Sequence, residues 1–389
     1  MKRFPLWILL ALLSCGIVTV GTGCQSGGKI APPASDGGPA RPVPYPAAPF
    51  RAPLVVASWN VENLFDTEDD PESDGDDGYA PSRWYRWTEV RYRLKLDHLA
   101  EVIVAMKPDI LCLVEVENRR VLEDLAQVIA KKEGRPKMEI DHREGGDLRG
   151  IEVAILSRFK PDPQSCKWKA PFSGIRDILS ATFVIDNRPL TVMVNHWKSK
   201  LGRKKESEEM REKCARTLRS LVEERLDGSA SPALLATGDF NDGPDSTFLA
   251  RAGATMEPEK GLKGGGPLLV NLNATIPDKK ARYSYFYERG GEWSELDMML
   301  VSAGLYTGRS PWKIRPGSYQ VFRHPLNLTP KGTPLPFRRR WGRGRGDLFI
   351  TGCSDHFPIR VELIPSDRNG GADKHPAQPQ GGVRIVPTR

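Results

Sequence analysis

Cysteine is scarce in this sequence and shows no pattern typical of a metal centre. The chain of 389 residues has six cysteines, and Cys15 and Cys24 fall in the N-terminal segment. Cys112 lies in an apolar stretch that predicts a strand, and Cys214 lies on an apolar helical face, so both are expected to be small core residues. Because the cysteines do not have the spacing of zinc ligands, the sequence excludes a cysteine-based zinc site.

The N-terminal apolar run, Phe4 to Leu13, is too short for a membrane span. It follows two basic residues and precedes small residues, a pattern that predicts a secretory signal over residues 1–24. The small residue before Cys15 and before Cys24 resembles a bacterial lipoprotein signal. Cys24 is the preferred lipid-bearing residue, and Cys15, with a leucine three residues upstream, is the alternative. We therefore expect an extracytoplasmic protein, lipid-anchored to a bacterial membrane or secreted.

The composition divides the rest of the chain into one folded unit and two flanking segments. Residues 25–53 are rich in Pro, Gly and Ala, and residues 366–389 are similar, so we expect a linker and a disordered tail with little to bury. The hydrophobic content of 39% suffices for a real core. Residues 54–365 are therefore expected to form a single layered α/β domain.

The charge of the chain is unevenly distributed. The formal net charge is +8 and the sequence pI is about 9.1, yet Asp66 to Asp77 is acidic. Lys198 to Lys205 and Arg338 to Arg345 are strongly basic, which favours a polyanionic partner such as nucleic acid. The alternative is that both basic runs are ordinary solvated loops.

A polar group follows the apolar run Ala233 to Ala236, at the point where the expected strand opens into a turn. Residues two apart in an extended segment point the same way, so Asp239 and Asn241 are expected to face one small volume. Such a pair can hold a water molecule and the phosphate that it attacks. Gly, Asn and Asp are also the usual turn formers, so a plain polar turn is the alternative.

Other expected strands also have polar residues at one end. Leu54 to Ala57, Ile110 to Val114 and Leu190 to Val194 read as strands that run into such residues, while Glu295 to Val301 and Ile359 to Leu363 carry them at their start. Apolar residues at helical spacing predict helices around residues 96–106, 121–130 and 210–221. There is no internal repeat. Strands that alternate with a few helices favour stacked sheets with helices outside. The polar residues at the strand ends are Asn60, Glu62, Glu115, His196, Asp239, Asn241, Asp297, Asp355 and His356.

This set of side chains predicts metal-assisted chemistry on a phosphate. Oxygen ligands without a cysteine cluster favour a hard divalent cation, Mg²⁺ or Mn²⁺, with Glu115 as the leading ligand. Asp239 suits the role of the base that aligns the attacking water, and Asn241 that of a phosphate holder. His196 and His356 can donate to the leaving oxygen or to the charge on phosphorus. For each histidine alone, a structural hydrogen bond is the alternative.

Six short motifs, in this order, resemble those of the endonuclease/exonuclease/phosphatase superfamily, the metal-dependent phosphodiesterases built like deoxyribonuclease I. The set spans essentially all of the expected domain, and it is far more specific than any one of its members. The motifs are Trp59-Asn-Val-Glu-Asn-Leu-Phe65, Pro108-Asp-Ile-Leu-Cys-Leu-Val-Glu115, Asn195-His196, Gly238-Asp-Phe-Asn241, Leu296-Asp297 and Ser354-Asp-His-Phe-Pro358.

The resemblance implies an α/β fold, a four-layered sandwich of two mixed β-sheets flanked by helices, with the active site at one edge. It assigns Asn60 and Glu115 to the metal site, with Glu62 and Asp355 assisting. It makes His196 and His356 the histidine pair, Asp239 and Asn241 the base and phosphate holder, and Asp297 the residue that orients His356. Arg176 and Asn195 match positions assigned to substrate binding, and the match of Arg176 to a phosphate-contacting arginine is loose.

The chain departs from the family pattern at two places. Val114 stands before Glu115 where glutamine is frequent, which leaves the carboxylate in place. Residues 325–347 form a long insert, whose run Arg338 to Arg345 could either grip a nucleic-acid backbone, with Trp341 stacking on a base, or form a disordered loop.

The motifs and the positive charge near the site favour a secreted nuclease that acts on DNA or RNA as a monomer. A phospholipid or small-molecule phosphoesterase is the alternative. A catalytically inactive binding lipoprotein is the alternative of another class, and it is disfavoured because the core set of residues is complete.

Overall fold

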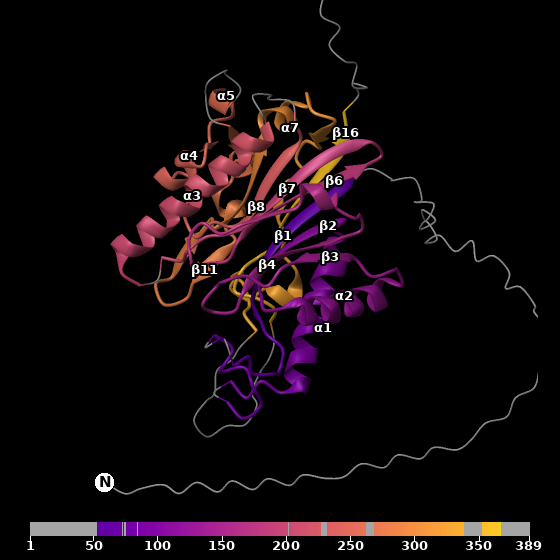
Figure 1. Ribbon diagram of the computed structural model, residues 1–389, viewed down its shortest axis with the longest axis vertical. Coiled ribbons are helices and arrows are strands. Elements are labelled where there is room, and N and C mark those ends of the chain that lie inside the picture. The colour runs from indigo at the N-terminus through magenta and orange to yellow at the C-terminus, as the bar shows by residue number, and fades with distance from the viewer. Residues whose placement is uncertain are drawn as a thin grey trace, which may run out of the picture. The chain divides into compact units, whose positions relative to one another are not determined.

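The computed structural model describes residues 53–71, 73, 75–83, 85–200, 202–226, 232–261, 268–337 and 352–366 (Figure 1). The expected signal of residues 1–24 lies outside the described residues, as do nearly all of the linker, the Arg338 to Arg345 run and the tail beyond residue 366. These four expectations remain predictions.

Within the described residues, the strands form two seven-stranded sheets and one two-stranded ribbon. The first sheet has the order β14 (Trp312–Ile314), β16 (Ile359–Pro365), β1 (Leu54–Leu64), β2 (Ile110–Val116), β4 (Glu152–Ser157) and β3 (Glu139–His142), with β15 (Gln320–Val321) also on β16. The second has the order β5 (Lys167–Lys169), β6 (Ile178–Ile185), β7 (Arg188–His196), β8 (Leu234–Asp239), β13 (Asp297–Ser302), β10 (Leu269–Asn271) and β9 (Ala254–Thr255). The ribbon pairs β11 (Tyr285–Tyr287) with β12 (Glu292–Ser294).

Helices cover the two outer faces of this pair of sheets. Figure 1 shows α1 and α2 on one side and α3 and α4 on the other. The α-helices are α1 (Glu89–Met106), α2 (Arg119–Glu133), α3 (Lys204–Leu226), α4 (Thr247–Arg251), α5 (Pro258–Gly261), α6 (Lys279–Arg282) and α7 (Ala303–Thr307). Three short 3₁₀ turns cover Pro163–Ser165, Leu272–Thr275 and Pro325–Asn327. The expected four-layered α/β sandwich is confirmed.

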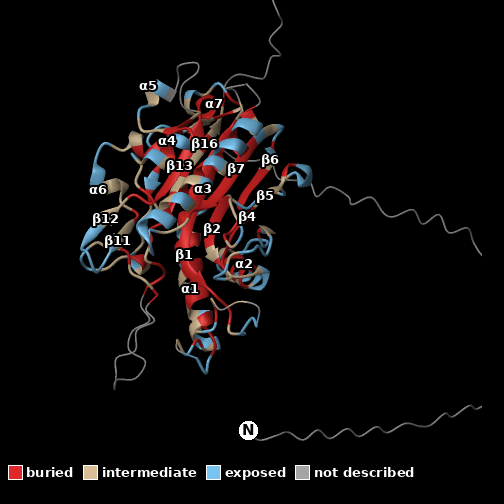
Figure 2. Ribbon diagram, turned by 60° about the vertical axis from the view of Figure 1, so that its left-hand side comes forward, coloured by how far each residue is buried: buried red, intermediate tan, exposed pale blue. Residues whose placement is uncertain are grey.

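Three apolar layers hold the sandwich together. The middle layer fills the space between the sheets and includes Val56, Cys112, Val192 and Leu235. A second layer joins the first sheet to α1 and α2, and a third joins the second sheet to α3 and α4. The central strands are buried on both faces, as Figure 2 shows in red, so they read as continuous apolar runs rather than alternating ones.

The expected helices are confirmed, with longer spans than the apolar spacing alone predicted. Helix α1 begins at Glu89, where the side chain of Thr88 accepts a hydrogen bond from the backbone of Arg91. It ends where Lys107 adopts a left-handed conformation before a proline. Across the described segments, no helix has both the length and the apolar character needed to cross a bilayer.

Strand direction positions the polar ends of the sheets. β1 and β2 run parallel in the first sheet, β7 and β8 run parallel in the second, and these two pairs face each other across the middle layer. The carboxyl ends of parallel strands lie at one edge of a sheet. Polar residues in the carboxyl-terminal parts of β1, β2, β7 and β8 are therefore brought to one edge of the sandwich.

Candidate active site

Asp239 lies at the centre of this edge, at the last position of β8. It is almost fully buried and stands opposite His196 of β7 on one side and Asp297 of β13 on the other. Its Oδ2 accepts a hydrogen bond of 3.1 Å from Nδ2 of Asn60, which comes from the other sheet. The site is therefore assembled across the two sheets.

Gly238 is required for the close approach of β7 and β8 at this point. Its φ angle is 131°, a region that side-chain-bearing residues rarely adopt. A Cβ atom there would lie 1.9 Å from the backbone oxygen of Asn195. A glycine at this position thus allows Asp239 to sit beside His196.

Asn241 reaches Asp239 through a turn, and the expected extended geometry is wrong. Its φ angle is 50°, so the strand has ended, and its backbone N–H donates to Asp239 Oδ1 at 2.8 Å. This is the polar turn that was the alternative reading, yet it also ties the backbone of Asn241 to the Asp239 carboxylate. The Asn241 amide donates one hydrogen to the Trp197 backbone oxygen at 3.0 Å, which leaves its second hydrogen for a ligand.

His356 and Asp297 form a buried pair, as the sequence predicted. His356 Nδ1 lies 2.7 Å from Asp297 Oδ2, and both side chains are at most 5% exposed. The backbone of His356 is fixed by Ser354 Oγ, which accepts its N–H at 3.0 Å. This places His356 Nε2 3.9 Å from Asp239 Oδ2.

His196 faces the same space from β7. Its Nε2 lies 3.8 Å from Glu115 Oε1 and 3.8 Å from Asp239 Oδ2. These separations exceed hydrogen-bond length, so the groups face each other across a gap rather than bonding directly. Glu115, one residue before the end of β2, has a left-handed conformation, and its Oε2 accepts the backbone N–H of Asn63 at 2.9 Å.

The two histidines have opposite pKa shifts. Burial lowers the pKa of His356, but the charge and hydrogen bond of Asp297, together with Asp239 and Asp355, outweigh burial and raise it well above its ordinary value. Burial lowers the pKa of His196 well below its ordinary value, and the nearby cation Arg176 adds to this effect. His356 is therefore cationic and His196 neutral near neutral pH.

The two central carboxylates also differ. Burial raises the pKa of Asp239 to about 7; Asp297 adds to this effect, and His356 opposes it. Burial also acts to raise the pKa of Glu115, but the charges of Arg149, His356 and other neighbours outweigh it and lower the pKa. Glu115 is therefore the more firmly ionised carboxylate of the two, which suits it to bind a metal cation.

Glu62 is placed differently from expectation. The prediction rested on an extended relation to Asn60, but Glu62 has a φ angle of 57° and its backbone N–H donates to Asn60 Oδ1. Its carboxylate accepts the backbone N–H of Phe337 at 2.8 Å. Glu62 thus binds the backbone at Phe337. Asp355 is half-buried and close enough to His356 to raise the pKa of that histidine.

Arg176 and Asn195, the expected substrate-binding residues, are structural in this conformation. The guanidinium of Arg176 is 4% exposed and donates to the backbone oxygens of His196 and Trp197 and to Asp147 Oδ2, each at 2.9 Å. Asn195 is fully buried, and its side chain bonds to Trp197 and to the backbone of β7 and β8. Both residues hold β7 in place.

Arg149 lies at the site although the sequence reasoning did not identify it. It sits on the loop between β3 and β4, its side chain is 50% exposed, and its Nη2 donates to Asn63 Oδ1 at 2.5 Å. Its Nη1 lies 4.0 Å from Glu115 Oε1. The feature of the sequence that could have indicated Arg149 is its position shortly before β4, the strand that pairs with β2.

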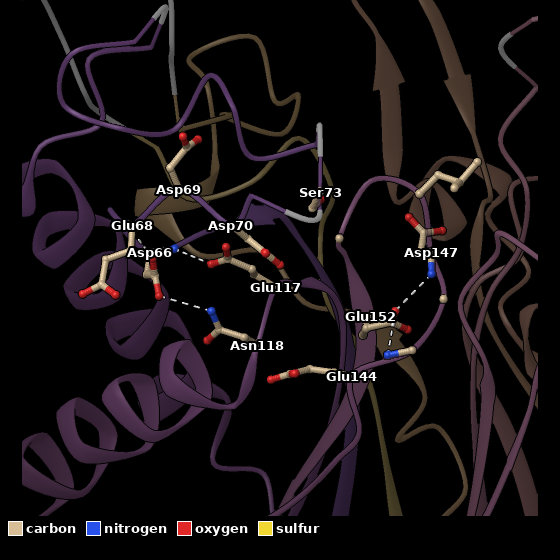
Figure 3. A pocket seen from close by; sticks show the side chains of 14 residues that line it. Asp66, Glu68, Asp69, Asp70, Ser73, Glu117, Asn118, Glu144, Asp147 and Glu152 are labelled. Carbon is tan, nitrogen blue, oxygen red and sulfur yellow. Dashed lines mark hydrogen bonds between the residues drawn. The ribbon is translucent and has the colours of Figure 1, made fainter. Parts of the chain in front are cut away.

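An acidic cavity of about 800 Å³ flanks the same loop (Figure 3). In Figure 3, Asp66, Asp70 and Glu117 lie on one side of the cavity, and Asp147 and Glu152 lie on the other. Leu148 and Gly150, the neighbours of Arg149, also line it. The edge of the sandwich therefore has an acidic cavity next to a site that contains several positively charged side chains.

The residues present fit a divalent metal ion of the magnesium class. Glu115 is ionised and faces a gap, and the carboxylate and amide oxygens at this gap suit Mg²⁺ or Mn²⁺. Among the described residues, no three acidic, His or Cys side chains form a ready-made metal cage.

The chain matches a known protein family and is similar to several solved structures. A family model described as "Endonuclease/Exonuclease/phosphatase family" matches residues 55–364. Humanized D. rerio TDP2 is 14% identical, with coverage of 80% of this chain and 99% of that chain and a TM-score of 0.49. The mannosyl-6-phosphatase of Bacteroides thetaiotaomicron is 17% identical, with the same coverage and a TM-score of 0.49. The human Nocturnin catalytic domain is 16% identical, with coverage of 80% and 93% and a TM-score of 0.49. No curated protein matched the sequence.

Proposed function

Since the chain belongs to the endonuclease/exonuclease/phosphatase family and is a phosphoester hydrolase of that family, we propose that it is a divalent-metal-dependent nuclease. In this proposal it cleaves phosphodiester bonds of DNA or RNA by in-line attack of water. The observation that carries the proposal is the buried pair of Asp239 and His356, which come from different parts of the chain and face one gap at 3.9 Å.

The residues of the site have complementary roles in such a reaction. Asp239 aligns the attacking water and accepts its proton, because it is the central carboxylate and its pKa of about 7 suits a base near neutral pH. The free amide hydrogen of Asn241 binds a phosphate oxygen. His356, held cationic by Asp297, stabilises negative charge on the phosphoryl group. His196 is neutral and can donate a hydrogen bond to the leaving oxygen.

The proposed metal site is formed by Glu115 and Asn60, with Asp355 near His356. When bound there, Mg²⁺ or Mn²⁺ would polarise the phosphoryl group and neutralise charge that develops in the transition state. Asn60 also donates to Asp239, which fixes the orientation of the base relative to that metal site.

Supercoiled plasmid tests this function directly. The purified protein should nick plasmid DNA in Mg²⁺ or Mn²⁺, and EDTA should abolish nicking. Asp239→Asn keeps the shape and the acceptor for the Asn241 N–H but loses the base, so activity should fall at least about 100-fold. Asp245→Asn, an exposed carboxylate in the same loop, is the matched control and should retain full activity. Equal loss in both variants, or no cleavage of DNA or RNA by the folded wild type, would contradict the nuclease proposal.

The preference for a polyanion rests on the basic segment Lys198 to Lys205. Its members include Lys200, Arg203 and Lys204, whose side chains are 58%, 85% and 89% exposed. Contacts between such groups and phosphates release counterions, so cleavage should weaken steeply with salt. The double variant Lys204→Gln/Lys205→Gln should flatten that salt dependence. Changing Lys131 and Arg135, exposed basic residues at the end of α2, should leave it unchanged.

The acidic cavity supports a second candidate, a phospholipid or small-molecule phosphoesterase. Its carboxylates would repel a further phosphate on that side and admit a neutral or cationic group instead. Hydrolysis of a small phosphoester with little salt dependence, together with inactivity on nucleic acid, would favour this candidate.

We further propose that the protein acts outside the cytoplasm through a lipid anchor on Cys24. The proposal rests on the sequence of residues 1–24, and Cys15 is the competing position. Palmitate labelling of the full chain in a bacterial host distinguishes them: Cys24→Ala should abolish labelling and Cys15→Ala should not. Labelling that survives both substitutions would refute lipid attachment at these cysteines.

A further inference from the structure

We propose that Arg149 is a substrate-binding residue, which contacts Asn63 and Glu115 in the free protein and turns to the phosphate when substrate enters. This inference rests on the proposed phosphoester hydrolysis at the same site. It assigns to Arg149 the phosphate contact that the sequence pattern had suggested for Arg176.

The first argument is the choice between the two arginines. Arg176 is 4% exposed, and its Nε, Nη1 and Nη2 all donate to protein oxygens, so it cannot leave without breaking three buried hydrogen bonds. Arg149 is 50% exposed, and its guanidinium makes one hydrogen bond, to Asn63, within the described residues. A guanidinium has five N–H donors, so Arg149 retains donors for a ligand.

The second argument is that the backbone of Arg149 is held firmly while its side chain is not. Asp147 Oδ1 accepts the N–H of Arg149 at 2.9 Å, and the Asp147 backbone oxygen accepts the N–H of Gly150 at 3.0 Å. Gly150 has a φ angle of 59°, which suits glycine in this tight turn. On its other side the turn packs against Gly75, where a Cβ would lie 2.0 Å from the Arg149 backbone oxygen.

The third argument is that this turn is tied to the catalytic strand. Asp147 uses its second oxygen, Oδ2, to bind Arg176, and Arg176 in turn binds the backbone oxygens of His196 and Trp197. The position of Arg149 is therefore set relative to His196 by a continuous chain of hydrogen bonds, which begins at the surface and becomes buried at Arg176. Asp147 and Arg176 are positioning residues in this arrangement.

The fourth argument is electrostatic. Nη1 of Arg149 lies 4.0 Å from Glu115 Oε1, the leading metal ligand. Arg149 and a divalent cation cannot both stay beside that oxygen without mutual repulsion. An incoming phosphate is an anion and attracts the guanidinium. The carboxylates that line the cavity beyond Leu148 are negatively charged and do not attract the phosphate. The guanidinium therefore marks the limit of the phosphate subsite on this side.

These arguments predict opposite effects of one substitution on two ligands. Arg149→Gln should weaken binding of inorganic phosphate to the Mg²⁺-loaded protein by about 10- to 100-fold, the loss of one charge-assisted contact. The same change should tighten binding of Mn²⁺ to the phosphate-free protein by about 2- to 5-fold, because a competing cation is removed. For phosphate, the affinity of Arg149→Lys should lie between those of wild type and Arg149→Gln, because lysine keeps the charge but lacks the planar guanidinium fork.

Isothermal titration with phosphate and electron paramagnetic resonance with Mn²⁺ measure these two quantities. Arg119→Gln is the matched control, since Arg119 is 55% exposed and pairs with a single carboxylate, Glu123, on α2. It should leave both binding constants unchanged. Circular dichroism checks the fold, and Arg149→Lys serves if the glutamine variant does not fold.

The inference is overturned if Arg149→Gln binds phosphate as wild type does, if it loses Mn²⁺ affinity, or if wild type does not bind phosphate. It is supported if phosphate binding falls while Mn²⁺ binding rises. Neither readout requires turnover. Failure to cleave any nucleic acid would refute the nuclease proposal, whereas the phosphate and Mn²⁺ binding of the Arg149 variants could still be interpreted without it.

Discussion

Replacing Glu152 by Gln should stabilise the protein at alkaline pH and leave its stability near pH 4.5 almost unchanged. Glu152 begins β4 and is 3% exposed. Its Oε1 accepts the backbone N–H groups of Gly145 at 3.2 Å and Asp147 at 3.4 Å, while its Oε2 has no hydrogen-bond partner among the described residues. Burial, reinforced by the charge of Asp147, raises the pKa of this carboxyl group to about 7 from an ordinary value of 4.5.

The size of the effect follows from proton linkage. Between pH 4.5 and about 7 the folded protein keeps a proton on Glu152 that the unfolded chain releases. The unfolded state then binds fewer protons, so the contribution of this group to stability is full below pH 4.5 and is lost as the pH rises to about 7. At about 1.4 kcal/mol per pH unit, the loss is about 3 kcal/mol. Glutamine keeps the Oε1 acceptor and cannot ionise, so the variant avoids this loss.

Chemical denaturation from about pH 5 to about pH 8 measures the difference. The stability of wild type should fall over this range by up to about 3 kcal/mol more than that of Glu152→Gln, or about 6 °C in Tm. Glu144→Gln is the matched control, because Glu144 lines the same cavity but is exposed. Other buried carboxylates also titrate, so the comparison between variants carries the test. A Glu152→Gln protein with the same pH slope as wild type would refute the reasoning.

Three further outcomes follow from the site. Gly238→Ala should lower stability by more than about 3 kcal/mol, because its Cβ would collide with the backbone of Asn195, whereas Gly291→Ala, with φ 67° and open space around it, should cost about 1 kcal/mol in thermal unfolding. Asp297→Asn should lower kcat at least about 100-fold and lower the His356 pKa in an NMR titration; an unshifted pKa would contradict their pairing. EDTA should abolish hydrolysis, and added Mn²⁺ should restore it without a change in circular dichroism; hydrolysis that persists in EDTA would contradict a metal requirement.

The strands and the edge where the polar residues meet could be predicted because both depend on local pattern. The apolar runs around Val56, Cys112 and Leu235 are long enough to specify central strands buried on both faces. Polar residues at the carboxyl ends of such parallel strands lie at one edge of the sheet. The sequence therefore placed Glu115, His196 and Asp239 near one another, although the pairing of the two sheets came from the family resemblance.

Backbone conformation at the strand ends was not predictable from the same pattern. An extended segment directs residues two apart to one side, but Glu62, Glu115 and Asn241 have φ angles of 57°, 66° and 50°. A left-handed residue turns the chain at each of these positions. The turn kept Asn241 beside Asp239 and directed the carboxylate of Glu62 to Phe337.

Burial was the second limit, and it decided the roles of the arginines. Arg176 and Arg149 have the same side chain, and no local pattern says which one is enclosed. Arg176 is buried because the backbone oxygens of His196 and Trp197 need donors. Arg149 is half-exposed, in a turn whose neighbouring residues Leu148 and Gly150 line the acidic cavity. These facts depend on tertiary packing rather than on spacing along the chain.

Because the site is divided between two sheets, it is complete only after β16 has been synthesised. Asn60 and Glu115 belong to the first sheet and Asp239 and Asp297 to the second, while His356 precedes the last strand, β16, which pairs with β1. A nascent chain that ends before residue 354 has neither the histidine nor the closed first sheet. Ribosome-bound intermediates that end before His356 and β16 should therefore be inactive, and hydrolysis would report chains that extend through β16 and whose two sheets have docked.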